Sequence, residues 1–159
     1  MKLVVLGANG QTGKLVLDAA LAKDMDVTAV VRSADKAPAR QHAGLHVVVG
    51  DPCDPLFLAS VFRDKDALVS TLGGRLPTKA ATSVYYRSAD AIVEAASATG
   101  LKRVLVTSTA LLFADQTLLG RILRLVVPNV VRSAGRMEEI LEKSGLDWTS
   151  ARAGFLNNT

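Results

Sequence analysis

Short apolar runs alternate with amphipathic segments along the whole chain, and this alternation restricts the fold more than any other feature. Apolar runs without polar alternation are typical of parallel strands buried on both faces, and helical periodicity between them predicts connecting helices. Right-handed crossovers between such strands produce a doubly wound sheet. We therefore predict an α/β, Rossmann-like parallel sheet in the order 3-2-1-4-5-6, in a single domain over residues 1–159. Strands are expected at residues 3–6, 27–31, 47–49, 67–71, 104–107 and 148–151, and helices at 12–23, 56–62, 78–99 and 132–143.

A glycine-rich loop joins the first predicted strand to the first predicted helix. Its spacing is G-x-x-G-x-x-G, with Gly7 suited to a tight turn, Gly10 to close approach of a ligand and Gly13 to helix packing. Backbone N–H groups at a helix N-terminus bind anions, so the loop predicts a dinucleotide pyrophosphate site. The alternative is a glycine-rich turn that binds nothing. The predicted cofactor contacts are Gly7, Asn9, Gly10, Gln11, Thr12 and Gly13.

The residues after the second predicted strand indicate which dinucleotide binds. Proteins that bind NAD usually carry a carboxylate here for the ribose hydroxyls, but this chain has Arg32. A guanidinium can bind a 2′-phosphate, and Ser33 and Lys36 can add donors. We predict NADP(H) as the preferred cofactor, with NAD(H) left open because Asp35 could reach a ribose; a solvated surface arginine is the alternative for Arg32.

These residues together resemble an atypical short-chain dehydrogenase/reductase. Within that group the chain is similar to the NADPH-dependent flavin reductase/biliverdin reductase B family and to related bacterial NAD(P)H-binding proteins, which implies an NAD(P)-binding Rossmann domain. The resemblance extends over essentially the whole chain. The matching stretches are residues 7–13, 27–32, 46–51, 66–69, 72–75, 104–112 and 144–148.

The resemblance implies further cofactor contacts at the ends of later strands. Asp51 corresponds to an adenine-contacting residue, and Arg75 corresponds to an arginine at the mouth of the following loop. The loop formed by Thr71, Leu72 and Gly73 would pass the ribose and phosphates.

The resemblance also implies a catalytic position at the end of the fifth strand. Thr107, Ser108 and Thr109 correspond to residues near the nicotinamide, and Thr109 stands where the flavin reductase has its active-site serine. Thr109 and Ser108 are therefore the candidate catalytic residues, with strand-end capping as the alternative role.

Two departures from the family pattern concern the substrate side. The family often has Arg-Pro-Gly after the sixth strand, whereas this chain has Arg152-Ala153-Gly154, followed by Phe155 where the flavin reductase has a histidine nearby. Relatives continue for several dozen residues beyond the position of Thr159, and that part is implied to complete the sheet and the substrate wall.

The chain lacks the Tyr-x-x-x-Lys pair that supplies acid–base catalysis in many short-chain dehydrogenases, which disfavours ordinary alcohol dehydrogenation. Flavin-, quinone- and linear tetrapyrrole-like acceptors take their proton from water and need less from the protein. We therefore expect an NADPH-dependent reductase of such a small-molecule acceptor. The alternative is a non-catalytic NADP(H)-binding redox sensor similar to NmrA-type regulators.

Charge and composition restrict the partners. The net charge is +4, and residues 71–136 hold nine basic and three acidic residues. This field favours an anionic ligand, while an aromatic content of 4% leaves little surface for stacking bases, so no nucleic-acid partner is expected. The single cysteine, Cys53, and the scattered histidines predict no metal site.

No segment is long and apolar enough to be a leader or a membrane span, because charged residues and Pro128 interrupt residues 111–131. We expect a cytoplasmic protein with no membrane partner, and the oligomeric state stays open. Within that stretch, an apolar group predicts either a lid over the acceptor or a part of the core: Leu118, Leu119, Ile122, Leu123, Leu125 and Val126.

Overall fold

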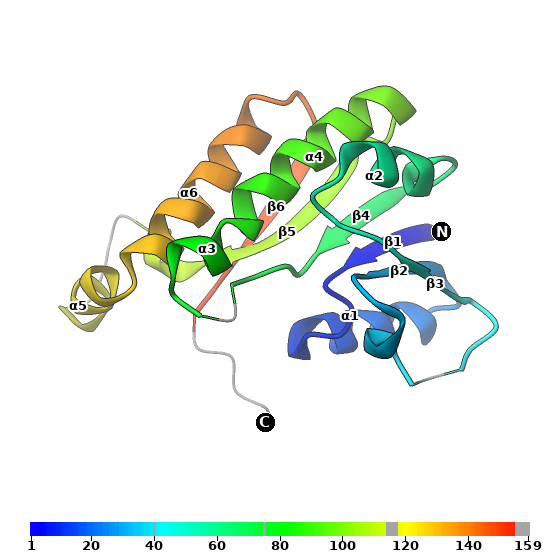
Figure 1. Cartoon of the computed structure of the whole chain (residues 1–159), viewed down its shortest axis with the longest axis horizontal. Helices are drawn as coiled ribbons and strands as arrows, with labels where there is room; N and C mark the ends of the chain where they lie inside the picture. Colours follow the sequence, from blue (N-terminus) through cyan, green and yellow to red (C-terminus); the bar gives the residue numbers. More distant parts are fainter. Residues whose placement is uncertain (40, 75, 114–117, 155–159) are drawn as a thin grey trace.

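The computed structural model describes residues 1–39, 41–74, 76–113 and 118–154. One six-stranded sheet has the order β3-β2-β1-β4-β5-β6, with parallel pairing throughout (Figure 1). The predicted fold class and strand order are confirmed. The strands are β1 (Lys2–Leu6), β2 (Asp26–Val31), β3 (Leu45–Val49), β4 (Ala67–Ser70), β5 (Arg103–Thr109) and β6 (Asp147–Ala153). The helices are α1 (Gln11–Leu21), α2 (Pro55–Phe62), α3 (Lys79–Thr82), α4 (Val84–Thr99), α5 (Leu118–Val126) and α6 (Pro128–Glu142), with 3₁₀ turns η1 (Ala34–Lys36) and η2 (Ala110–Leu112).

The two faces of the sheet are covered unequally. Helices α2, α4 and α6 pack over one face, where Leu68, Val104 and Leu141 belong to the larger hydrophobic cluster (Figure 1). On the other face α1 packs against β1 and β2 in a smaller cluster that includes Leu17 and Val27. Among the described residues no helix covers β5 and β6 on that side, and Asp147, Thr149 and Ala151 of β6 are exposed there. The expectation that both faces are covered therefore holds only for the strands beneath α1.

Two helical boundaries differ from the sequence prediction. The segment expected as one helix over residues 78–99 forms α3 and α4, and α3 begins where the Thr78 hydroxyl accepts a hydrogen bond from the Ala81 N–H at 3.2 Å. Gly100, in the left-handed region at φ 79°, ends α4 as expected. Helix α6 begins at Pro128 rather than at residue 132, because a proline at the first helical position needs no partner for an N–H.

Helix α5 was not predicted as a separate element, and its side chains do not join the core. Leu118, Ile122, Leu125 and Val126 are all at least half exposed. The expectation of core burial is therefore wrong for these four residues. Within the described residues no helix is long and apolar enough to cross a bilayer.

Candidate cofactor-binding site

A cleft of about 370 Å³ opens at the carboxyl ends of β1, β2 and β4. The strand order reverses between β1 and β4, and such reversal points are where open parallel sheets bind ligands. Its lining comes from the β1–α1 loop (residues 7–10), the end of β2 (residues 30–32), the loop after β4 (residues 71–73), and Lys36, Pro52, Ala81 and Val84.

The glycine loop gives this cleft an uncapped helix N-terminus. Gly7 has φ +80°, and a Cβ there would lie 2.8 Å from Thr71 Oγ1. A Cβ on Gly13 would lie 2.2 Å from the Gly7 carbonyl oxygen, so only glycine lets α1 start this close to β1. Gly10 occupies the N-cap position of α1 and offers no side-chain acceptor, and the first turn has no acidic residue. The N–H groups of that turn, from Gln11 to Gly13, are thus available to an anion.

Thr71 joins the end of β4 to this loop. Its backbone N–H donates to the Leu6 carbonyl at 2.9 Å, and its hydroxyl lies within hydrogen-bond distance of the Leu6 and Gly7 carbonyls at 3.0 and 3.2 Å. Thr71 therefore has a positioning role that the sequence did not reveal, in addition to lining the cleft with Leu72 and Gly73.

Tyr85 supports the same loop from α4. Its hydroxyl oxygen lies 3.2 Å from where a Cβ of Gly73 would be. Burial raises the pKa of Tyr85, which keeps the phenol protonated at neutral pH.

The basic residues after β2 have different surroundings. Arg32 is exposed, lines the cleft, and forms no ion pair with a carboxylate in the described parts of the chain. Lys36 also lines the cleft, but its Nζ lies 3.0 Å from the Asp35 carboxylate. The Ser33 hydroxyl, and to a smaller extent Lys36, hold the pKa of Asp35 below its ordinary value. Ser33 is not among the residues that line the cleft.

Asp51 stabilises the turn beside the cleft and does not itself line the cleft. Its carboxylate accepts a hydrogen bond from the Cys53 N–H at 2.9 Å, and its neighbour Pro52 lines the cleft. Burial, and then the Asp51 charge, raise the pKa of Cys53, which keeps this thiol protonated.

The predicted catalytic hydroxyls lie on opposite faces of β5. Thr107 and Thr109 are half-buried on the face that lacks a covering helix, whereas Ser108 is buried on the face under α6. The Thr109 hydroxyl accepts a hydrogen bond from the Leu111 N–H at 3.3 Å and so caps η2. None of the three lines the cleft described above. Arg75 and Phe155 lie outside the described residues.

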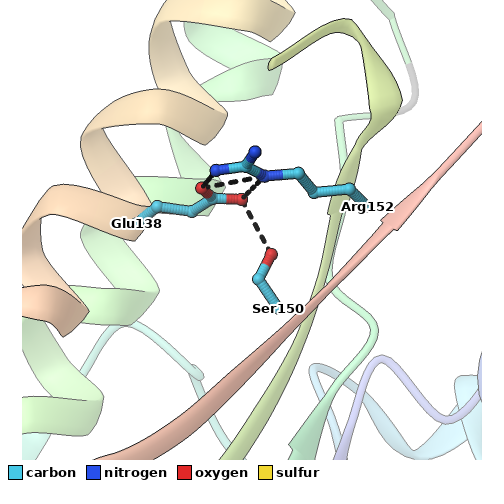
Figure 2. A network of polar contacts seen from close by, with 3 residues as sticks. All are labelled: Glu138, Ser150 and Arg152. Carbon is cyan, nitrogen blue, oxygen red and sulfur yellow. Dashed lines mark hydrogen bonds and ion pairs between the residues drawn. The ribbon is translucent and has the colours of Figure 1, made fainter. Parts of the chain in front are cut away.

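A partly buried ion pair that the sequence analysis missed joins β6 to α6 (Figure 2), and its arginine pairs in register with Ser108 of β5. Arg152 of β6 donates to the Glu138 carboxylate of α6 from Nε and Nη2, the latter at 2.6 Å, and the Ser150 hydroxyl donates to the same carboxylate at 2.7 Å. The Glu138 side chain is only 8% exposed and that of Arg152 is 33% exposed. The guanidinium also lies 5.2 Å from the ring centroid of Phe113.

The ion pair keeps Glu138 charged in a buried position. Burial would raise the pKa of this carboxyl, but the hydrogen bonds from Arg152 and Ser150, with the Ser108 hydroxyl on the same side of the sheet, lower it below its ordinary value. The Ser108 hydroxyl nevertheless makes no hydrogen bond of ordinary geometry within the described residues. The only feature of the sequence that pointed to this polar cluster was that Ser150 and Arg152 fall on the same face of a strand.

The sequence matches the NAD(P)H-binding family over residues 7–159. The chain therefore belongs to the NAD(P)H-binding family. Membership of this family indicates a nicotinamide dinucleotide as the ligand. The cleft, the glycine loop and the helix N-terminus are the features expected of a site for such a ligand.

Solved structures of longer proteins share the fold. ChuY from Escherichia coli O157:H7, described as an anaerobilin reductase, is 26% identical, with 96% of this chain and 72% of that chain covered and a TM-score of 0.77. A short-chain dehydrogenase/reductase from Veillonella parvula in complex with NADP is 22% identical (95% and 68% covered, TM-score 0.77). The enzyme WbmH from Bordetella bronchiseptica in complex with NAD+ is 23% identical (95% and 54% covered, TM-score 0.77). The chain thus spans about half to three quarters of the length of these proteins.

Replacing Gly13 with alanine should weaken NADP+ binding by more than about tenfold, because the new Cβ forces α1 away from the loop. Gly135→Ala is the matched control, since a Cβ there meets only Leu112 Cδ2 at an ordinary 3.6 Å. Binding is measured by titration calorimetry after circular dichroism has shown both variants to be folded. A folded Gly13→Ala protein with wild-type affinity would contradict the role given to this glycine.

Arg152→Met should lower the free energy of unfolding at neutral pH by about 3 kcal/mol, because it leaves the buried Glu138 carboxylate without its cation. Glu138→Gln should cost less, since the arginine left behind is already a third exposed to water. Because the pair lowers the pKa of Glu138, its contribution is present above the ordinary glutamate pKa and is lost as pH falls through the lowered value.

The deficit of Arg152→Met relative to wild type should therefore shrink as the pH falls from neutral to about pH 3, below the ordinary glutamate pKa. Urea unfolding at both pH values measures it. A deficit that grows on acidification, or a larger cost for Glu138→Gln, would show that the pair does not stabilise the fold in this way.

Proposed function

We propose that this protein is an NADPH-dependent oxidoreductase that transfers a hydride to a flavin-, quinone- or linear tetrapyrrole-like acceptor. The observation that carries the proposal is the cleft at the strand-order reversal, where an uncapped helix N-terminus and the unpaired Arg32 face one ligand-sized space. Membership of the NAD(P)H-binding family supports the cofactor class. The bound cofactor would supply the hydride, and the protein would position the two reactants.

The preference for NADP(H) is inferred from the charges after β2. Arg32 lines the cleft and has no carboxylate partner among the residues that the structure describes, which suits a 2′-phosphate. Asp35, the carboxylate that could hold an NAD ribose, is occupied by Ser33 and Lys36. One structural neighbour carries NADP and another NAD+, so the fold itself accommodates either, and NAD(H) use stays open.

The acceptor class is supported by what the β5 end contains. Thr109 would offer a hydroxyl close to the acceptor. Ser108 lies on the opposite face of β5, toward Glu138, and would influence the acceptor only by shifting the position of the strand. The absence of Tyr-x-x-x-Lys favours acceptors that take their proton from water. ChuY, 26% identical, is described as an anaerobilin reductase, which favours a tetrapyrrole-like acceptor among the three.

A second candidate function is a redox sensor that binds NADP(H) without turnover. It is favoured by the state of the two candidate hydroxyls, because that of Thr109 already caps η2 and that of Ser108 is buried. The two functions differ in one measurable property, which is turnover in the presence of an acceptor.

The protein should oxidise NADPH when FMN, menadione or biliverdin is supplied, as followed by the absorbance of the reduced cofactor. Thr109→Ala should reduce turnover with that acceptor by about tenfold through loss of one hydrogen bond, while Thr109→Ser retains it. Thr149→Ala on exposed β6 is the control. Tight NADP+ binding without turnover on any acceptor would favour the sensor, and absence of binding would refute both functions.

Arg32→Glu should reverse the cofactor preference, because the new carboxylate repels a 2′-phosphate and can accept hydrogen bonds from ribose hydroxyls. We expect the affinity for NADP+ to fall by at least about tenfold while that for NAD+ holds or rises, as measured by calorimetry. Arg63→Glu, an equal charge change at the far end of α2, is the control. An unchanged ratio of the two affinities would remove Arg32 from the cofactor site.

A further inference from the structure

Helix α5 turns its apolar side to solvent, which is the reverse of a surface helix in a globular protein. Leu118, Ile122, Leu125 and Val126 follow the spacing of one helix side, and the two leucines are 75% and 82% exposed. Leu123, which borders this side next to Val126, is half-buried. We call the four exposed residues the α5 apolar face.

The surroundings of this face are also apolar. Phe113, which follows η2, is 49% exposed, and α5 contacts η2. Leu76 is 62% exposed and precedes Pro77, whose carbonyl accepts a hydrogen bond from Asn129 at the start of α6. Exposed apolar surface that extends over several elements is typical of an interaction site.

Helices α3 and α5 and residues 128–137 of α6 carry basic side chains and no acidic ones. Residues 67–89 and 116–137 contain no aspartate or glutamate. The two segments are joined by the Asn129–Pro77 hydrogen bond and by a Ser133–Thr82 hydrogen bond of 3.1 Å. The basic residues of α3, α5 and this part of α6 are Lys79, Arg121, Arg124, Arg132 and Arg136. This positive charge favours a partner whose surface is anionic where it meets the α5 apolar face.

We propose that α5 is an interfacial helix that docks this protein on an anionic lipid bilayer. The α5 apolar face would enter the boundary between headgroups and acyl chains, and the exposed Arg121 and Arg124 on its flank would meet lipid phosphates. Such a helix lies in the plane of the interface and needs no spanning segment. The proposal therefore revises the expectation of no membrane partner, which rested on the lack of a span.

A second copy of the chain fits this face less well. A two-fold contact between α5 helices would bring the arginines of both copies to one boundary, and α5 itself has no carboxylate to compensate them. The phosphates of a bound cofactor would not neutralise the α5 arginines either, because the cofactor cleft lies at the ends of β1 and β2. The proposal is independent of the reductase function.

The test is co-sedimentation of the full chain with phosphatidylcholine vesicles, with and without phosphatidylglycerol, at low and high salt. We expect pelleting with the anionic vesicles, weak pelleting with phosphatidylcholine alone, and release by salt. Arg121→Gln with Arg124→Gln should weaken binding about 25-fold, at about fivefold for each arginine. Ile122→Glu with Leu125→Glu should abolish it.

Two matched controls separate α5 from general effects. Leu56→Glu changes another exposed leucine, 80% exposed on α2, and Lys23→Gln with Lys102→Gln removes two exposed charges elsewhere. Both should bind vesicles like wild type. Equal binding to both vesicle types, no pelleting at all, or controls as impaired as the α5 variants would overturn the proposal. So would a dimer in sedimentation velocity that Ile122→Glu with Leu125→Glu dissociates, since a second copy would then cover the face.

Discussion

The contact between Gly13 and the Gly7 carbonyl determines the geometry on which the rest of the cleft depends. With no room for a Cβ at position 13, α1 can begin directly beside the end of β1. Thr71 then brings the end of β4 to the same carbonyls, so three elements meet where the strand order reverses. The backbone N–H groups of the first turn of α1 are consequently available to an anion without a charged side chain in the loop. In the proposed reductase, Arg32 would then discriminate between cofactors.

The parts of this structure that could be predicted from sequence are those set by local pattern. Buried strands such as residues 3–6 and 27–31 show as unbroken apolar runs, and the glycine spacing requires a turn followed by a helix. Strand order followed because right-handed crossovers allow few arrangements of such units. The family assignment depends on the same local features, which is why the resemblance and the fold agree.

The parts that could not be predicted depend on contacts between distant residues. Glu138 reads as one of several polar residues on a helix, and only the packing of α6 on β6 brings it within 2.6 Å of Arg152. The amphipathic pattern of residues 118–126 was visible, but a pattern does not say whether its apolar side faces the core or the solvent. Ser33 likewise has the chemistry of a cofactor ligand, but it is not among the residues that line the cleft, and it lowers the pKa of Asp35.

The alternation of side chains along β5 separates two roles that the sequence could only group together. Ser108 pairs in register with Arg152, so its hydroxyl belongs to the buried side where α6 brings Glu138. Thr109, one residue on, faces the side without a covering helix and caps η2, the turn that α5 contacts. A hydroxyl on the covered side can affect an acceptor only by shifting the strand, whereas one on the open side can meet it directly. In the proposed reductase the hydride acceptor would therefore bind on the open side of β5, and it would meet Thr109 rather than Ser108 first.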